Sequence, residues 1–559
     1  MHFSPIYLTG TIFVLSLITS LFFLANKQVV KKIIRKYWRI LFILVFINLA
    51  IKYPFGNKYF DGLEYEDSYI YKVSARTMYE GSYQYSKINP YYPTSCVFGS
   101  LKDCRQSAIF VTNFIGYPYL INLVYHLFGY HKNISNMVSL FFSGISIALI
   151  FFVALLIIDQ LFFALICCFI YITIPIFNVY ASTSLTEPLS NAYLVLILLL
   201  YLAYIGSYQE GERARFQNML GLSAIVFSMI FAILVKTTNI SLVFCLPIAG
   251  LISYFKGGKD KGGNPRRRFV ISLPFIFAIF FFSLLVLKFQ TAVEINRGDI
   301  GINPFSISFL KTLAPIFTRS LFKLNWYLIY TIFFIFGLFL ALRKKNGTYL
   351  VVIYLFYFVL YTLHYRSYYF TRGIPVFEDE SIRYMMSFVS IYALIVGLGA
   401  YFLWDWIKIK TANWSFRIDG KLIIAFILFI GLGFSVFFTL KCRHYFYEDE
   451  QYVRVRPVTN VLDYIKDDKD VLITSEPILF QIYGGANLRI IDFCSIGILF
   501  SGKEVDTLIK NSRVYYLETI SRDSIDQDRY RDQMRYIDTK PKEHVCVGQN
   551  FTLFRLLTE

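Results

Sequence analysis

The chain has 559 residues, of which 56% are hydrophobic, and it carries a formal net charge of +18 at pH 7. With a mean hydropathy of +0.52 it has more apolar surface than a water-soluble protein can cover, so the composition indicates an integral membrane protein. The charge does not indicate nucleic-acid binding, because Lys and Arg gather in short loops between apolar runs, as at 31–36, 266–268 and 343–345. The apolar runs are continuous rather than alternating, which favours helices over membrane strands.

About twelve apolar runs predict membrane-spanning helices, although several are shorter than the roughly 20 residues of an average span. They cover residues 6–25, 37–54, 134–158, 160–180, 186–206, 218–235, 238–255, 269–288, 324–342, 348–364, 383–407 and 420–440. With the N-terminus outside, the positive-inside rule is satisfied by all five basic loops, at 26–37, 207–217, 256–268, 343–347 and 408–419. Residues 1–36 are then an extra span with a basic cytoplasmic loop, and residues 37–440 form the main membrane domain.

The first long outer loop covers residues 55–133 and contains a further apolar stretch, 109–128. A span there would turn every later basic loop outward, against the positive-inside rule. Pro118 and several polar residues also interrupt the stretch, so we expect helices that lie in the membrane interface. Cys96 and Cys104 share this loop, where a disulfide is one option.

Residues 441–559 differ in composition from the rest and are rich in charge. Short strand-like runs at 471–474, 489–491, 514–517 and 551–554 alternate with helix-like stretches at 455–466 and 503–511. This alternation predicts a small α/β domain outside the membrane. In the spans, Cys167, Cys168 and Cys245 are expected to be core residues.

The sequence predicts no cofactor. Its His and Cys residues have no zinc-like spacing, and it contains no P-loop or dinucleotide fingerprint. A divalent metal ion has no support in the sequence either.

Asp67 is the first candidate for chemistry, because it lies in the outer loop beside an apolar run. Tyr71 follows four residues later, so on a helix the two side chains share one face. A carboxylate held against the bilayer can act as a general base toward an acceptor hydroxyl or amine. The alternative is a solvated loop acid, since Glu64 and Glu66 lie close by.

An ordered series of weak motifs covers about residues 37–440 and consists of 67–75, Gly81, 117–120, 127–129, Thr186-Glu187-Pro188, Lys236 and Arg383-Tyr384. This series resembles the GT-C glycosyltransferases that use lipid-phosphate sugars, a superfamily that includes protein O-mannosyltransferases and aminoarabinose transferases. The resemblance implies a polytopic GT-C fold. It also implies that Asp67 is the catalytic base and that the site faces the extracytoplasmic side.

The resemblance is imperfect at the base itself. Many relatives have Asp-Glu where this chain has Asp67-Ser68, with Glu66 on the other side. A partner acid is then Glu66 or one from elsewhere in the chain, of which Glu187 is the best placed. A metal requirement taken from relatives with paired acids is therefore not supported here.

Three basic residues are candidates for binding the donor lipid. The guanidinium of Arg383, followed by Tyr384, suits a departing lipid phosphate, and Lys236 is a lesser helper. Arg366 lies in an aromatic-rich outer loop, where it gates the lipid site or anchors the loop.

Each of these candidates also has a structural interpretation. Glu187 suits the positive end of a helix dipole with Pro188 in the first turn. Arg383 suits the headgroup region as a snorkelling side chain or as a partner of Glu380, three residues earlier, and Lys236 suits the same region as a snorkelling side chain.

The function that follows is transfer of a sugar from a polyprenyl-phosphate donor to an extracytoplasmic glycan, lipid or protein acceptor, with inversion. The expected location is the plasma membrane of a bacterium. The alternatives are a secondary transporter or flippase lined by Glu187, Lys236 and Arg383, and a non-enzymatic scaffold. Against a transporter, the sequence shows no repeated halves.

Overall fold

The computed structural model describes residues 5–57, 66–79, 115–131, 133–174, 177–178, 181, 183, 185–206, 212–256, 311, 328–344, 346–363, 385–410, 426, 429–434, 436–437, 456–465, 470–474, 480, 489–492, 502–519, 536–548 and 551–558. By internal contacts the chain divides into two units. The first comprises Met1–Asn57, Asn113–Tyr117 and Asn136–Cys442, and the second comprises Lys58–Thr112, Pro118–Ser135 and Arg443–Glu559.

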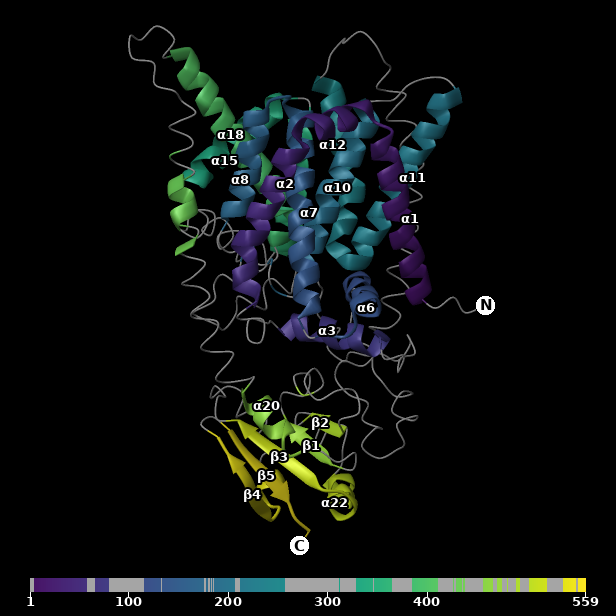
Figure 1. Cartoon of the computed structure of the whole chain (residues 1–559), viewed down its shortest axis with the longest axis vertical. Coiled ribbons are helices and arrows are strands. Elements are labelled where there is room, and N and C mark those ends of the chain that lie inside the picture. The colour runs from purple at the N-terminus through teal and green to yellow at the C-terminus, as the bar shows by residue number, and fades with distance from the viewer. Residues whose placement is uncertain are drawn as a thin grey trace. The chain divides into compact units, whose positions relative to one another are not determined.

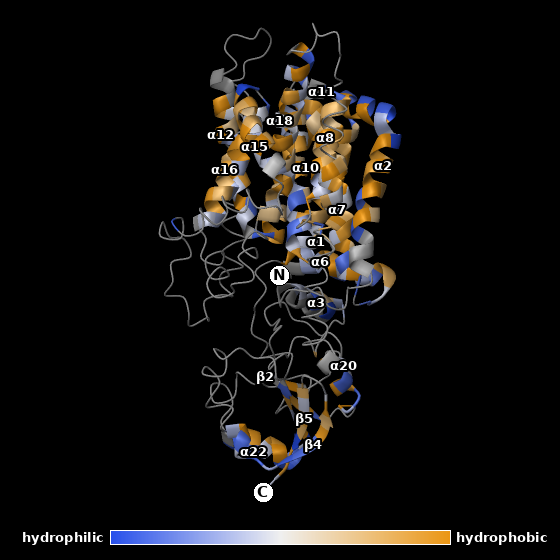
Figure 2. Cartoon of the chain, turned by 90° about the vertical axis from the view of Figure 1, so that its left-hand side faces the viewer, coloured by the Kyte–Doolittle hydropathy of each residue, from blue (hydrophilic) through white to orange (hydrophobic). Residues whose placement is uncertain are grey.

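The first unit is a bundle of apolar helices (Figure 1). Its described helices are α1 (Pro5–Ala25), α2 (Gln28–Asn57), α7 (Ile134–Ile157), α8 (Leu161–Thr173), α10 (Thr186–Gly206), α11 (Glu212–Val235), α12 (Ser241–Lys256), α15 (Leu328–Arg343), α16 (Gly347–Leu363) and α18 (Val389–Lys410), with the short 3-10 helix η2 (Thr237–Ile240) before α12. Among the described residues, five helices are long and apolar enough to cross a membrane. Figure 2 shows hydrophobic colouring along most of their length. The protein is therefore an integral membrane protein.

Helices α10 and α18 form the centre of this bundle. In their most apolar stretches 78% and 83% of the residues are buried, compared with 33% in α1. Glycines allow the close packing of α18: a methyl group on Gly337 of α15 would overlap the carbonyl of Ile395, and one on Gly397 would overlap the sulfur of Cys167 on α8. Glycine at these two positions therefore allows α15 and α8 to pack closely against α18.

The predicted spans agree with the described helices at most positions, and the differences have local causes. Helix α2 begins at Gln28, so much of the predicted basic loop is helical, with a break at Asn26 and Lys27. Helix α8 ends at Thr173 and Ile174 is extended, because Pro175 disfavours the helical conformation of the residue before it. The predicted span 269–288 lies outside the described residues, as does most of 420–440.

Two helices of the outer loop are described. Helix α3 (Glu66–Tyr79) carries both Asp67 and Tyr71. Helix α6 (Gly116–Phe128) has 13 residues, fewer than the roughly 20 of an average span. Aromatic contacts join the two helices, with the ring centres of Tyr79 and Tyr125 5.8 Å apart. The interfacial location of this segment stays a prediction.

The second unit contains a five-stranded sheet in the order β2-β1-β3-β5-β4. Its strands are β1 (Val471–Thr474), β2 (Arg489–Asp492), β3 (Val514–Thr519), β4 (Lys542–Val547) and β5 (Phe551–Leu556). β1 pairs in parallel with β2 and β3, and β5 pairs antiparallel with β3 and β4. Helix α20 (Arg456–Leu462) packs on one face of the sheet through Val458 and Val461, and α22 (Gly502–Asn511) packs on the other through Val505 and Leu508.

The four predicted strands correspond to β1, β2, β3 and β5, and the two predicted helices to α20 and α22. Sequence analysis missed β4, whose residues Lys542, Glu543 and His544 do not form an apolar run. β4 lies at the edge of the sheet, where charged residues are common because they discourage pairing with another chain. The placement of 441–559 as a separate extracytoplasmic domain stays a prediction.

Candidate active site

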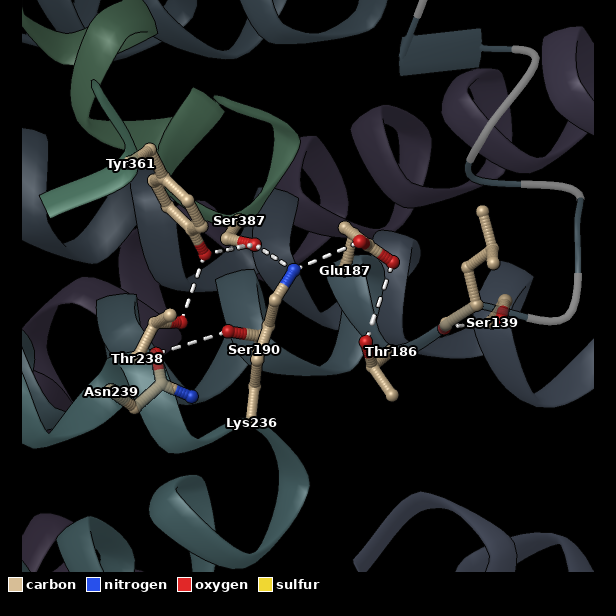
Figure 3. A network of polar contacts seen from close by, with 10 residues as sticks. Ser139, Thr186, Glu187, Ser190, Lys236, Thr238, Asn239, Tyr361 and Ser387 are labelled. Atoms are coloured by element: carbon tan, nitrogen blue, oxygen red, sulfur yellow. Dashed lines mark hydrogen bonds and ion pairs between the residues drawn. The ribbon is translucent and has the colours of Figure 1, made fainter. Parts of the chain in front are cut away.

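A buried ion pair joins two of the predicted site residues. The ammonium nitrogen of Lys236 lies 2.8 Å from Oε1 of Glu187, and their side chains are only 5% and 2% exposed. The two residues are 49 positions apart and belong to different helix ends, at the start of α10 and just after α11. Figure 3 shows the two side chains pointing toward each other.

Lys236 also reaches the turn that leads into α18. Its ammonium donates a hydrogen bond of 3.0 Å to Oγ of Ser387, and the hydroxyl of Tyr361 donates another of 3.2 Å to the same oxygen. The hydroxyls of Thr238 and Tyr361 lie 2.9 Å apart (Figure 3). The ends of α10, α11 and α16 and the start of α18 therefore meet at one polar cluster.

The local sequence explains why each charged group lies where it does. Glu187 and Pro188 occupy the first turn of α10, where a fixed φ is tolerated and a negative charge faces the positive end of the helix dipole. Lys236 is extended and separates α11 from η2. The carbonyl of Ala232 accepts from the backbone N–H of Lys236 at 2.9 Å and from the side chain of Asn239 at 2.7 Å, so both residues close the end of α11.

The outer-loop motif 117–120 contacts the same region through its first residue. The hydroxyls of Tyr117 and Ser139 are 2.6 Å apart, and Ser139 donates at 3.3 Å to the carbonyl of Leu185, two residues before Glu187. A methyl group on Gly116 would come within 2.9 Å of the backbone nitrogen of Val235, next to Lys236. Three motifs that are far apart in the sequence, and that carry the GT-C resemblance, therefore meet.

The ion pair of Glu187 and Lys236 has no net charge, and this determines what the two residues can do chemically. A buried carboxylate and ammonium in contact cancel each other's charge, whereas either group alone would be costly inside a membrane protein. The contact gives both residues a role in joining helices. It also makes Lys236 a weaker attractor of phosphate than a lysine without a carboxylate would be.

The other predicted site residues are described only in part. Asp67 and Glu66 lie on α3, but their side chains lie outside the described residues. Tyr71 is buried, at 6% exposure. Arg366, Arg383 and Tyr384 also lie outside the described residues, so their predicted roles stay predictions.

Sequence analysis missed two buried polar residues inside spans. Lys52 of α2 is fully buried, donates at 2.8 Å to Ser143, and lies 4.6 Å from the ring centre of Tyr171. Asn191 of α10 is fully buried and contacts α18. Both residues could have been identified from the sequence, as a lysine within the predicted span 37–54 and an asparagine within 186–206. Polar residues inside a span are costly unless they have partners.

In the part of the chain that the structure describes, no group of three or more His, Cys, Asp or Glu side chains is arranged to hold a metal ion. The free cysteines Cys167, Cys168 and Cys245 are buried, as predicted.

Solved structures provide the comparison, since no protein-family model and no curated protein matches this chain. ArnT from Cupriavidus metallidurans in the apo state matches with a TM-score of 0.57 and 13% identity, over 93% of this chain and 98% of that one. The oligosaccharyltransferase of Archaeoglobus fulgidus in the apo form matches with a TM-score of 0.54 and 12% identity, over 91% and 73% of the two chains.

Both neighbours have also been solved with lipid phosphates. ArnT was crystallised with undecaprenyl phosphate and matches with a TM-score of 0.56 and 12% identity, over 93% of this chain and 98% of that one. The oligosaccharyltransferase AglB was solved with an inhibitory peptide and a dolichol-phosphate, with a TM-score of 0.53 and 11% identity, over 94% and 75%. Both are GT-C fold glycosyltransferases. The present chain has the GT-C fold, as its motifs predicted.

Proposed function

We propose that this protein is a membrane glycosyltransferase that moves a sugar from a polyprenyl-phosphate donor to an acceptor outside the cytoplasm. The observation that carries the proposal is the fold match over 93% of the chain to a GT-C enzyme solved with a lipid phosphate. The motif-bearing helix α3, with Asp67 in its first turn, supports it from the sequence side. The proposed location is the bacterial plasma membrane, with the site outward.

In the proposed reaction, Asp67 accepts a proton from the acceptor hydroxyl or amine. The freed lone pair forms a bond to the anomeric carbon, on the side opposite the phosphate. The bond between that carbon and the phosphate oxygen breaks, and the polyprenyl phosphate departs with the bonding electrons. The configuration inverts because a single displacement takes place. No cofactor enters this scheme.

Arg383 is proposed to bind the departing phosphate through its two-pronged guanidinium, with Tyr384 beside it. Lys236 contributes less, because Glu187 already neutralises it at 2.8 Å. Glu187 is then more important for holding Lys236 than for proton transfer. Glu66, Tyr71 and Arg366 complete the proposed substrate contacts.

The test uses purified protein in nanodiscs with a radiolabelled polyprenyl-phosphate sugar and a membrane extract that supplies acceptors. Asp67→Asn should lower the transfer rate about 10²–10⁴-fold, the usual contribution of a general base. Glu64→Gln makes the same chemical change three residues earlier and should leave transfer near the wild-type rate.

Three outcomes separate the candidate functions. Near-normal transfer by Asp67→Asn removes Asp67 as the base. Translocation of the labelled lipid in vesicles without transfer supports the flippase. Neither activity, with protein that is folded and inserted, supports the scaffold.

A further inference from the structure

One face of α2 is exposed along both its basic part and its apolar part. The exposed side chains on this face recur every three or four residues, so they form one stripe along the helix. We call it the α2 stripe: Lys31, Arg35, Trp38, Arg39, Phe42 and Phe46. Figure 2 shows α2 at the right-hand edge of the helical bundle, blue near its start and orange along its middle.

The opposite face of α2 packs on the bundle. Val30, Ile33 and Leu44 are buried. A methyl group on Gly144 of α7 would lie 3.5 Å from the side chain of Leu49, so the two helices are in contact there. The α2 stripe therefore faces away from the described helices, toward the surrounding bilayer.

The first half of the stripe is strongly basic. Helix α2 contains no acidic residue, and among the described residues no carboxylate forms an ion pair with Lys31, Arg35 or Arg39. The guanidinium carbon of Arg39 lies 5.4 Å from the ring centre of Trp38, which is itself 55% exposed. Two guanidinium groups one helical turn apart can bind one phosphate, since each presents a planar pair of donors.

The second half of the stripe is apolar. Phe42 and Phe46 are 69% and 63% exposed and belong to the predicted span 37–54. With a rise of about 1.5 Å per residue, Phe46 lies roughly 10 Å from Arg39 along the helix, within the roughly 15 Å depth of one hydrocarbon leaflet. The stripe thus runs from cations through an indole to phenyl rings. A phospholipid has the matching order, from phosphate through the glycerol region to acyl chains.

We propose that the α2 stripe binds an anionic phospholipid of the surrounding bilayer. Its phosphate lies between Arg35 and Arg39, and an acyl chain lies along Phe42 and Phe46. A soluble anion would leave those two rings uncovered, so a lipid fits the whole stripe better. In the predicted topology this end of α2 faces the cytoplasm, so the lipid occupies the leaflet opposite the predicted donor site. The inference does not depend on the proposed transferase activity.

The experiment is native mass spectrometry of the full-length protein in detergent with phosphatidylglycerol, which is anionic, or phosphatidylcholine, which has no net charge, both with the same acyl chains. The wild-type protein should bind the first phosphatidylglycerol about tenfold more tightly. Arg35→Gln/Arg39→Gln should reduce this preference to less than about twofold, because the charge-dependent contacts are lost. Phe42→Ala/Phe46→Ala should weaken the binding of both lipids by a similar factor, because acyl-chain contacts do not depend on the headgroup.

Two further variants control for charge and for geometry. Arg343→Gln/Lys344→Gln also removes two exposed positive charges, at the end of α15, and should keep the tenfold preference because the stripe is intact. Arg35→Lys/Arg39→Lys keeps the charge but loses the planar pair of donors, so it should retain a preference of about threefold. All these positions are exposed, and circular dichroism should show an unchanged helix content in each variant.

Three results would overturn the inference. The first is equal binding of the two lipids by the wild-type protein. The second is an equal loss of preference in Arg343→Gln/Lys344→Gln, which would mean that net positive charge attracts the lipid without the stripe. The third is displacement of phosphatidylglycerol by millimolar inorganic phosphate with no effect of Phe42→Ala/Phe46→Ala, which would indicate a site for a soluble anion. None of these results bears on sugar transfer, which is measured with the donor lipid.

Discussion

Two buried lysines in the helical bundle are stabilised in different ways. Lys236 contacts a carboxylate, Glu187, at 2.8 Å. Lys52 contacts the hydroxyl of Ser143 at 2.8 Å and the ring faces of Tyr171 and Phe177, whose centres lie 4.6 and 4.4 Å from its nitrogen. Among the described residues, no carboxylate forms an ion pair with Lys52.

The comparison shows that burial alone does not define the role of a charge. The pair of Glu187 and Lys236 is neutral and joins helix ends, so each residue depends on the other. The nitrogen of Lys52 instead lies against π faces, which attract a cation by about 2 kcal/mol or more when water is excluded. Removing each lysine should therefore have different consequences.

The largest expected effect comes from breaking the ion pair. Lys236→Met leaves Glu187 buried without its partner and should lower the free energy of unfolding by about 3–5 kcal/mol. Glu187→Met should cost a similar amount. The double variant Glu187→Met/Lys236→Met should lose much less than the sum, because two apolar side chains replace two paired charges. Unfolding in mixed detergent micelles measures all three, and strictly additive losses would contradict the pairing.

Lys52→Met should have a smaller effect, near zero or stabilising. The substitution loses one hydrogen bond and two ring contacts, but it also replaces a buried amine, which is costly to remove from water, with an apolar side chain. The measurement is the same unfolding experiment, compared directly with Lys236→Met. A loss as large as that of Lys236→Met would show that Lys52 has a partner of comparable strength.

The smallest effect is expected at an exposed pair in the sheet-containing unit, which serves as a reference. The ammonium nitrogen of Lys540 lies 2.6 Å from Oδ1 of Asp506, but the Asp506 side chain is 42% exposed. The hydrogen bond from Lys540, helped by one from Tyr536, lowers the pKa of Asp506. Exposed pairs contribute about 0.2–1 kcal/mol, so Asp506→Asn should destabilise this unit by less than 1 kcal/mol at pH 7.

The sign of the pH dependence follows from the lowered pKa. The stabilisation by Asp506 is present above its unfolded pKa of about 3.9 and is lost as the pH falls through the lower folded value. Hydrogen exchange of α22 should therefore differ between wild type and Asp506→Asn at pH 7 and converge in strong acid. Asp538→Asn, at the exposed pair with Lys542, controls for the loss of one charge. A difference that grows on acidification would contradict this assignment.

Much of the fold was predictable because its signals are local. Helix α10 matches the predicted span 186–206 at both ends, and β1 matches the predicted strand 471–474. Such elements follow from long apolar runs or from short β-branched runs, which need no information about distant partners. The failures were also local in cause, such as the early end of α8 before Pro175 and the charged edge strand β4.

The candidate site was predictable only as a set of residues. Glu187 and Lys236 were identified separately, one as a partner for Asp67 and the other as a phosphate ligand, and their contact with each other was not anticipated. Nothing in the spacing of 49 residues favours that pairing, since it depends on the ends of α10 and α11 meeting. Asn191 was missed for the same reason, because a hydrogen bond between two helices leaves no periodic signal in the sequence.

The sequence by itself determined the membrane class, most of the helices and the strands that carry apolar runs, because hydrophobic length and alternation act within one segment. Only the tertiary structure decided how the polar residues inside those segments are partnered. Burial in a bundle makes each charge or amide select a nearby group, and which group is near depends on how helices distant in the sequence pack together.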